Sequence, residues 1–229
     1  MRLFLTLLIL GQGFLSGFQP RQEVNLINVQ VNYEFNQKIT ISGGFNYIKN
    51  ISSSGIVLQF ENGQTYEQEL SLITPSNFSL DFVPQQINAL PFSRIYYWFV
   101  IVFEDGTHYT SPSYWFDYVD DQFSWKNSSS KWFEIFWTSE DSEVGQNIQA
   151  IALEGLKSST SLLPVSPKLP IKIFVYPDNT SLQIASGKTT VENLSGTALL
   201  ESNTILVSES DDLTKSVNFD RQIPHEITH

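Results

Sequence analysis

Residues Ile95-Tyr96-Tyr97-Trp98-Phe99-Val100-Ile101-Val102-Phe103 form an unbroken run of β-branched, aromatic and aliphatic side chains. The run falls far short of the roughly 20 residues that a membrane-spanning helix needs. Because β-branched and aromatic residues favour extended backbone, it predicts a central β-strand that is buried on both faces. Glu104-Asp105-Gly106-Thr107 follows as a turn and leads to Tyr114-Trp115-Phe116, which predicts a β-hairpin.

The chain before this run contains shorter segments of the same kind. Apolar residues alternate or cluster in residues 29–33, 39–41 and 56–60, and turn residues separate these segments. Asn62-Gly63 is a hairpin signal, because both residues tolerate positive φ. Together these patterns predict an all-β sandwich over residues 24–119.

The N-terminus has the pattern of a secretory signal peptide over residues 1–17. Met1-Arg2 supplies a basic start, residues 3–10 an apolar core, and residues 11–17 an exit rich in small residues. An uncleaved N-terminal anchor is the alternative interpretation. The chain has no cysteine, so an exported domain would be stabilised without disulfides, and this favours bacterial export.

The charge balance is strongly acidic. Thirteen basic and 24 acidic residues give a net charge of −11, which argues against a nucleic-acid partner.

The second half of the chain has a different pattern of predicted secondary structure, in which strands alternate with helices. Residues 120–131 are polar and predict a linker, in which Asp120-Asp121 is interpreted as a solvated turn or, less strongly, as a calcium site. Residues 132–229 then predict the order β-α-β-(irregular)-β-α, with strands at 132–137, 171–176 and 204–208. Apolar residues at helical spacing between 144 and 163 form the stripe of the first helix.

The last residues, Ile223-Pro224-His225-Glu226-Ile227-Thr228-His229, contain the pattern H-E-x-x-H. Residues four apart lie on one face of a helix, so His225 and His229 could bind one zinc ion, with Glu226 as the general base. We expect Asp220 to cap this helix and Pro224 to fall in its first turn. The third histidine, His108, follows the hairpin turn and is expected at the surface.

Three stretches of the sequence resemble one known family. They are residues 90–99, residues 114–125 and Arg221-Gln222-Ile223-Pro224-His225-Glu226-Ile227-Thr228-His229. The chain is similar to exported bacterial proteins in which a peptidase MA-like (gluzincin-type) zinc metallopeptidase domain follows an immunoglobulin-like module. Only the third stretch is chemically specific.

The resemblance implies an immunoglobulin-like sandwich at 24–119 and an α/β, incomplete metallopeptidase domain at 132–229. It implies that His225 and His229 bind zinc and that Glu226 is the catalytic base. The edge strand that lies along the peptide substrate would be residues 204–208 with the segment before them. The family takes its third ligand from a glutamate on a later helix, so we expect a fragment that is inactive by itself.

The expected activity is zinc-dependent hydrolysis of a peptide or protein substrate, in a protein that is secreted or held at the cell surface. Membrane association through an uncleaved N-terminus or a later C-terminal segment stays open. The alternative function is a non-catalytic cell-surface binding or adhesion module with a degenerate peptidase-like domain. A metal-binding hydrolase that does not cleave peptides is the third hypothesis.

Overall fold

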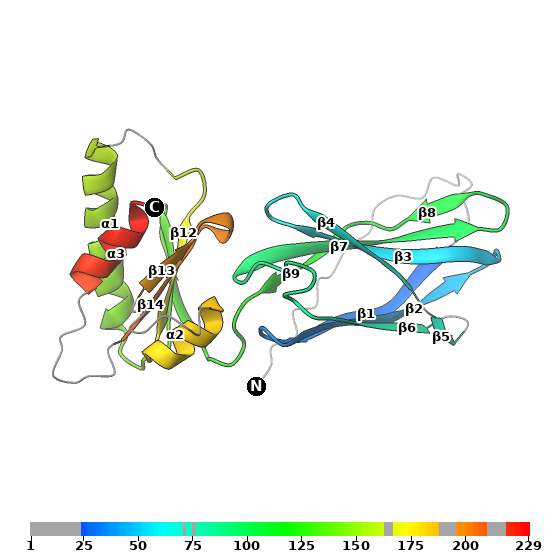
Figure 1. Ribbon diagram of the computed structural model, residues 1–229, viewed down its shortest axis with the longest axis horizontal. Coiled ribbons are helices and arrows are strands. Elements are labelled where there is room, and N and C mark those ends of the chain that lie inside the picture. The colour runs from blue at the N-terminus through cyan, green and yellow to red at the C-terminus, as the bar shows by residue number, and fades with distance from the viewer. Residues whose placement is uncertain (1–23, 71, 75–76, 163–166, 188–195, 210–218) are drawn as a thin grey trace, which may run out of the picture.

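A computed structural model describes residues 24–70, 72–74, 77–162, 167–187, 196–209 and 219–229. The predicted signal peptide at 1–17 lies outside the described residues. The described chain forms two parts side by side, an all-β part and a part with helices on a smaller sheet (Figure 1). None of its helices combines the length and the apolar character needed to cross a bilayer.

The first part is a β-sandwich of two antiparallel sheets. One sheet has the strand order β1-β2-β6-β5, and the other has the order β4-β3-β7-β8, with β9 also paired to β7. The strands are β1 (Val24–Glu34), β2 (Lys38–Tyr47), β3 (Ile51–Phe60), β4 (Thr65–Glu69), β5 (Leu72–Thr74), β6 (Asn77–Phe82), β7 (Ser93–Phe103), β8 (His108–Thr110) and β9 (Tyr114–Tyr118).

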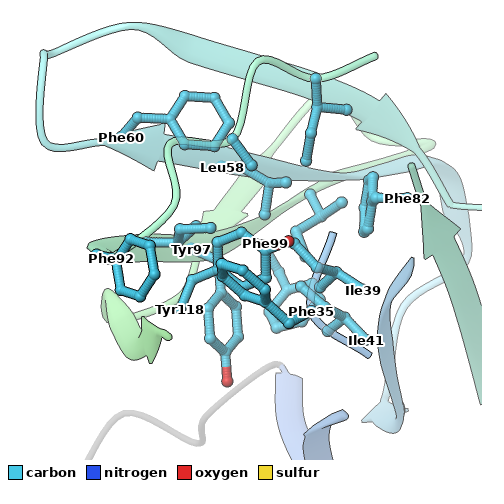
Figure 2. Close-up of a cluster of buried hydrophobic side chains, with 14 of the residues drawn as sticks. Phe35, Ile39, Ile41, Leu58, Phe60, Phe82, Phe92, Tyr97, Phe99 and Tyr118 are labelled. Carbon is cyan, nitrogen blue, oxygen red and sulfur yellow. The ribbon is translucent and has the colours of Figure 1, made fainter. Parts of the chain in front are cut away.

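Strand β7 is central, as predicted, because it pairs with β3 on one side and with β8 and β9 on the other. Its side chains alternate strictly between buried and half-buried, so only one of its faces is fully buried. The prediction of two buried faces was therefore wrong. The buried face points between the two sheets, where Tyr97 and Phe99 meet Phe35 and Ile41 in the sandwich core (Figure 2).

Both predicted hairpin turns are present. Gly63 has φ +84° and donates its N–H to Phe60 O at 2.9 Å, between β3 and β4. Gly106 has φ +81° and donates to Phe103 O at 3.0 Å, between β7 and β8. His108 is exposed on β8, as expected for a surface residue.

The second part is a mixed sheet with helices on its faces. Its strand order is β10-β11-β12-β14-β13, in which β11, β12 and β14 are parallel and the two outer strands are antiparallel to their neighbours. The elements are β10 (Lys126–Ser129), β11 (Phe133–Trp137), α1 (Glu143–Leu162), β12 (Ile171–Tyr176), α2 (Asn179–Ser186), β13 (Gly196–Leu199), a short 3-10 helix (Leu200–Ser202), β14 (Thr204–Ser208) and α3 (Phe219–Ile227).

This part differs from the sequence-based expectation in three places. The expected linker at 120–131 contains β10, which pairs with β11. Strand β14 lies inside the sheet with every residue buried, so residues 204–208 are not the edge strand. Among the described strands the edge is β13, which lies in the segment before them that was part of the same expectation. Helix α2 occupies the stretch expected to be irregular.

Local capping explains α2. Asp178 accepts a hydrogen bond from Ser181 N at 2.7 Å, and Gly187 ends the helix with φ +67°. A carboxylate at the N-cap satisfies a backbone donor that has no partner within the helix, and glycine adopts the left-handed conformation at the end without strain.

The two faces of the mixed sheet have different partners. Helices α1 and α3 cover one face, where Ile148, Ala152 and Ile223 pack on Ile173 and Val207. The other face carries Phe174, Tyr176 and Leu206, which join α2 and the sandwich in a single apolar cluster.

Aromatic rings connect the two parts. Phe174 lies 4.4 Å from Phe92 of the sandwich and 5.1 Å from Trp125, measured between ring centroids. Lys172 Nζ donates to Phe92 O at 2.7 Å, and Asn36 Nδ2 donates to the carbonyl oxygens of α2. The sandwich and the mixed sheet are therefore packed together rather than tethered by a linker.

Candidate metal centre

Helix α3 carries the H-E-x-x-H residues and packs against α1, β13 and β14. Ile223 anchors the helix, because its side chain is fully buried in the apolar cluster beneath α1. Asp220 lies in the first turn of a helix that already begins at Phe219, so the prediction that it caps the helix was wrong.

Pro224 lies inside α3, not in its first turn as predicted. A proline there removes the hydrogen bond to the carbonyl four residues earlier. That carbonyl belongs to Asp220, an exposed residue that water can reach. The proline ring faces Gly155 of α1, where an added Cβ would lie only 3.0 Å from Pro224 Cα. A glycine on α1 thus permits the close approach of the two helices.

The two histidines of the motif face one another. Their Nε2 atoms are 3.4 Å apart, and their ring planes meet at 85° with centroids 5.0 Å apart. Both residues are exposed. Two nitrogens bound to one tetrahedral zinc ion, each at about 2.0–2.1 Å, would be separated by about 3.3–3.4 Å. The pair fits two ligand positions of such an ion, although the distance also suits a hydrogen bond between the rings.

The last helical turn holds the pair together. His229 N donates to Glu226 O at 3.3 Å, and Thr228 donates to His225 O from both its backbone N–H and its hydroxyl, at 3.1 Å and 2.6 Å. Both backbone bonds reach three residues back, so the chain continues as a tight turn beyond Ile227, where the helix ends, and His229 lies beside His225.

Glu226 is half-buried and points to the edge strand. A Cβ added to Gly196, the first residue of β13, would lie 3.5 Å from Glu226 Oε1. The carboxylate therefore lies beside the backbone of β13. His225 precedes Glu226 in the helix, and His229 follows it by three residues, just beyond the helix end.

Among the described residues, no group of three or more His, Cys, Asp or Glu side chains gathers to hold a metal. The described part of α3 thus offers two nitrogen ligands. A catalytic zinc ion takes three protein ligands and one open position.

The acidic pair Asp120-Asp121, interpreted from the sequence as a solvated turn, is in part buried. Asp120 is only 2% exposed; its carboxylate accepts hydrogen bonds from Gln122 N at 3.0 Å and from Tyr176 Oη at 3.0 Å. Trp125 Nε1 donates to Asp120 O at 2.7 Å. The residue joins the sandwich to β12 and has a structural role that its place in a polar segment did not indicate.

Burial raises the pKa of the Asp120 carboxyl above its usual range, against the lowering effect of its two hydrogen bonds. A carboxyl group whose pKa is higher in the folded state than in the unfolded state stabilises the fold when it is protonated. This contribution to the free energy of unfolding is fully present below the unfolded-state pKa of about 3.9 and is lost as the pH rises through the folded-state pKa. The free energy of unfolding of the wild type should therefore fall, relative to that of Asp120→Asn, as the pH rises above about 4. Urea denaturation across this range measures the difference. The exposed carboxyl variant Asp81→Asn is the control, and a difference that stays constant or grows with pH would contradict the prediction.

A small cavity lies where the sandwich meets the end of β13. This cavity of about 290 Å³ is lined by Leu90, Pro91 and residues 198–202. A larger groove of about 910 Å³ runs between the two parts, with Arg94, Asp117, Phe136 and Lys172 among its lining residues. Sequence reasoning indicated neither, because each is formed by segments far apart in the chain.

No family model matches this sequence, and no curated protein matches it. Solved structures match in part. They include a Br derivative of BhCBM56 (15% identity, 39% of this chain and 88% of that chain, TM-score 0.29) and a β-1,3-glucan binding domain of carbohydrate-binding module family 56 (14% identity, 39% and 95%, TM-score 0.27). OgpA from Akkermansia muciniphila matches at 16% identity and TM-score 0.34, over 47% of this chain and 31% of that chain. These scores and identities are too low to transfer a function to this chain. The sheet topology itself shows that the chain is rich in β-strands and contains a β-sandwich.

Proposed function

We propose that the chain is part of an exported zinc-dependent peptidase. His225 and His229 would hold the ion, with a third ligand from outside the described residues, and Glu226 would act on the attacking water. The observation that carries the proposal is the 3.4 Å separation of the two Nε2 atoms on a helix whose glutamate reaches the edge strand. The strand orders β1-β2-β6-β5 and β4-β3-β7-β8 support an immunoglobulin-like module before it.

The edge strand supplies a means of holding the substrate. An edge strand presents backbone N–H and C=O groups that can pair with an added extended peptide. Among the described residues, β14 is the strand paired with β13, and the proposal places the substrate along the opposite edge of β13. A peptide added along that edge would pass Glu226 near Gly196.

The chemistry divides between ion and side chain. Zinc, when bound, polarises a carbonyl and makes a water molecule more acidic. Glu226 accepts the proton of that water and then donates it to the leaving amine. The half-buried position of Glu226 beside the β13 backbone keeps its carboxylate on the side where an added peptide would lie.

Zinc binding tests the ligand assignment. The full-length protein should bind one zinc ion per chain, and His225→Ala should weaken zinc binding by more than about 100-fold. Mutating a residue that only hydrogen-bonds a metal ligand already weakens metal binding by about 10–100-fold, and loss of a ligand itself should cost more. His108→Ala, which removes an exposed histidine on β8, is the matched control. Isothermal titration with a competing chelator measures both affinities. Equal affinities of wild type and His225→Ala would overturn the assignment.

A further inference from the structure

The small cavity at the end of β13 is built from both parts of the molecule. Leu90 and Pro91 come from the sandwich, and Ala198, Leu199 and Leu200 come from the edge strand and the turn after it. Its volume of about 290 Å³ lies at the lower limit of small-molecule pockets, about 300–1,000 Å³, so it suits a side chain better than a whole ligand.

The sandwich wall of the cavity is held in place. Phe92, which follows Pro91, is fully buried at φ +61°, and its N–H donates to Tyr118 O at 2.8 Å. Ser93 Oγ donates to Leu90 O at 2.6 Å. Since binding costs less when the site is already ordered, such a wall suits recognition of an incoming group.

Leu200 stands out among the lining residues. It is 68% exposed, although a leucine ordinarily lowers the free energy of the fold by being buried. Its neighbour Leu199 packs against the shared apolar cluster, so Leu199 is accounted for by the fold while Leu200 is not. An exposed leucine at the mouth of an apolar cavity offers apolar surface to a partner.

The cavity also lies in line with the candidate centre. Strand β13 begins at Gly196, beside Glu226, and ends at Leu199, which lines the cavity. At about 3.3 Å per residue, the two points are about 10 Å apart along the strand. A peptide antiparallel to β13 runs from the cavity toward Glu226, so the residue at the cavity precedes the cleaved bond by about three positions.

We infer that this cavity is a specificity subsite that accepts an apolar side chain of the peptide substrate, about three residues N-terminal to the cleaved bond. The inference rests on the proposed function. Glu201 also lines the cavity and should disfavour an acidic side chain there by charge repulsion.

Paired peptides test the subsite. Two substrates that differ only in Leu or Ser at this position should be cleaved by the full-length wild type with kcat/KM values about 10–100-fold apart, in favour of Leu. Leu200→Ser should reduce that ratio several-fold, mainly by slowing cleavage of the Leu peptide. The control is Leu153→Ser, which changes a partly exposed leucine on α1. Thermal unfolding checks that both variants fold.

Binding gives a readout that does not depend on turnover. The same peptides bound to the full-length Glu226→Gln protein should show the same preference in fluorescence anisotropy, and Leu200→Ser in that background should remove it. Cleavage of both peptides at equal rates, or an unchanged ratio in Leu200→Ser, would overturn the subsite alone. Failure of the wild type to cleave any peptide would overturn the proposed function and the subsite with it.

Discussion

Glu226→Gln in the full-length protein should lower peptide hydrolysis by about 10²–10⁴-fold, the usual contribution of a general base. Glutamine has nearly the same shape as glutamate but cannot accept the proton of the attacking water. Because His225 and His229 are untouched, zinc content should stay at the wild-type level. The measurements are kcat/KM on an unstructured protein substrate and the zinc content of the dialysed protein.

The matched control is Glu154→Gln, which removes an exposed carboxylate from α1 and should leave hydrolysis unchanged. If Glu226→Gln retains full activity, the base has been misassigned. If the wild type binds zinc but cleaves no peptide, a metal-binding hydrolase of another kind becomes the better hypothesis. If it neither binds zinc nor cleaves peptides, the non-catalytic binding module is favoured.

Phe174→Ala should lower the free energy of unfolding by about 3–5 kcal/mol, the range for loss of a fully packed phenylalanine. The ring is 1% exposed and stacks on Phe136 at 4.4 Å with planes 8° apart. It also contacts Phe92 and Trp125 across the junction. Since one cluster serves both parts, we expect a single unfolding transition to move as a whole.

Urea denaturation followed by tryptophan fluorescence and by circular dichroism measures this effect with two probes. Ile184→Ala, which shortens a 52% exposed side chain on α2, should change stability by less than 1 kcal/mol. Two separate transitions, with only one displaced by Phe174→Ala, would show that the sandwich and the mixed sheet unfold independently.

Local sequence patterns predicted the long elements well. Residues 171–176 and 204–208 form strands with the expected bounds, and α1 follows from apolar residues at helical spacing, of which Ile148 and Ala152 are buried. Such patterns report which side of an element is buried. They do not report which other element covers the buried side. The contact between Phe174 and Phe92 could therefore not be predicted from the sequence around either residue.

Short elements were missed for a related reason. Strand β13 has four residues, two of them Gly and Ala, and its extended form depends on pairing with β14. Helix α2 had a readable signal in Asp178 and Gly187, its two caps, but its eight residues give too little periodicity. Pro224 lies inside α3 rather than in its first turn because the helix already includes Phe219, one residue before the predicted cap Asp220.

Gly155 bears only a hydrogen where other amino acids bear a carbon, and α3 lies as near to α1 as that hydrogen allows. The separation between α1 and the helix that carries His225 is therefore limited by a position seventy residues before that histidine. A methyl group on residue 155 would push Pro224 away and so displace the helix that carries His225 and Glu226, without changing either side chain.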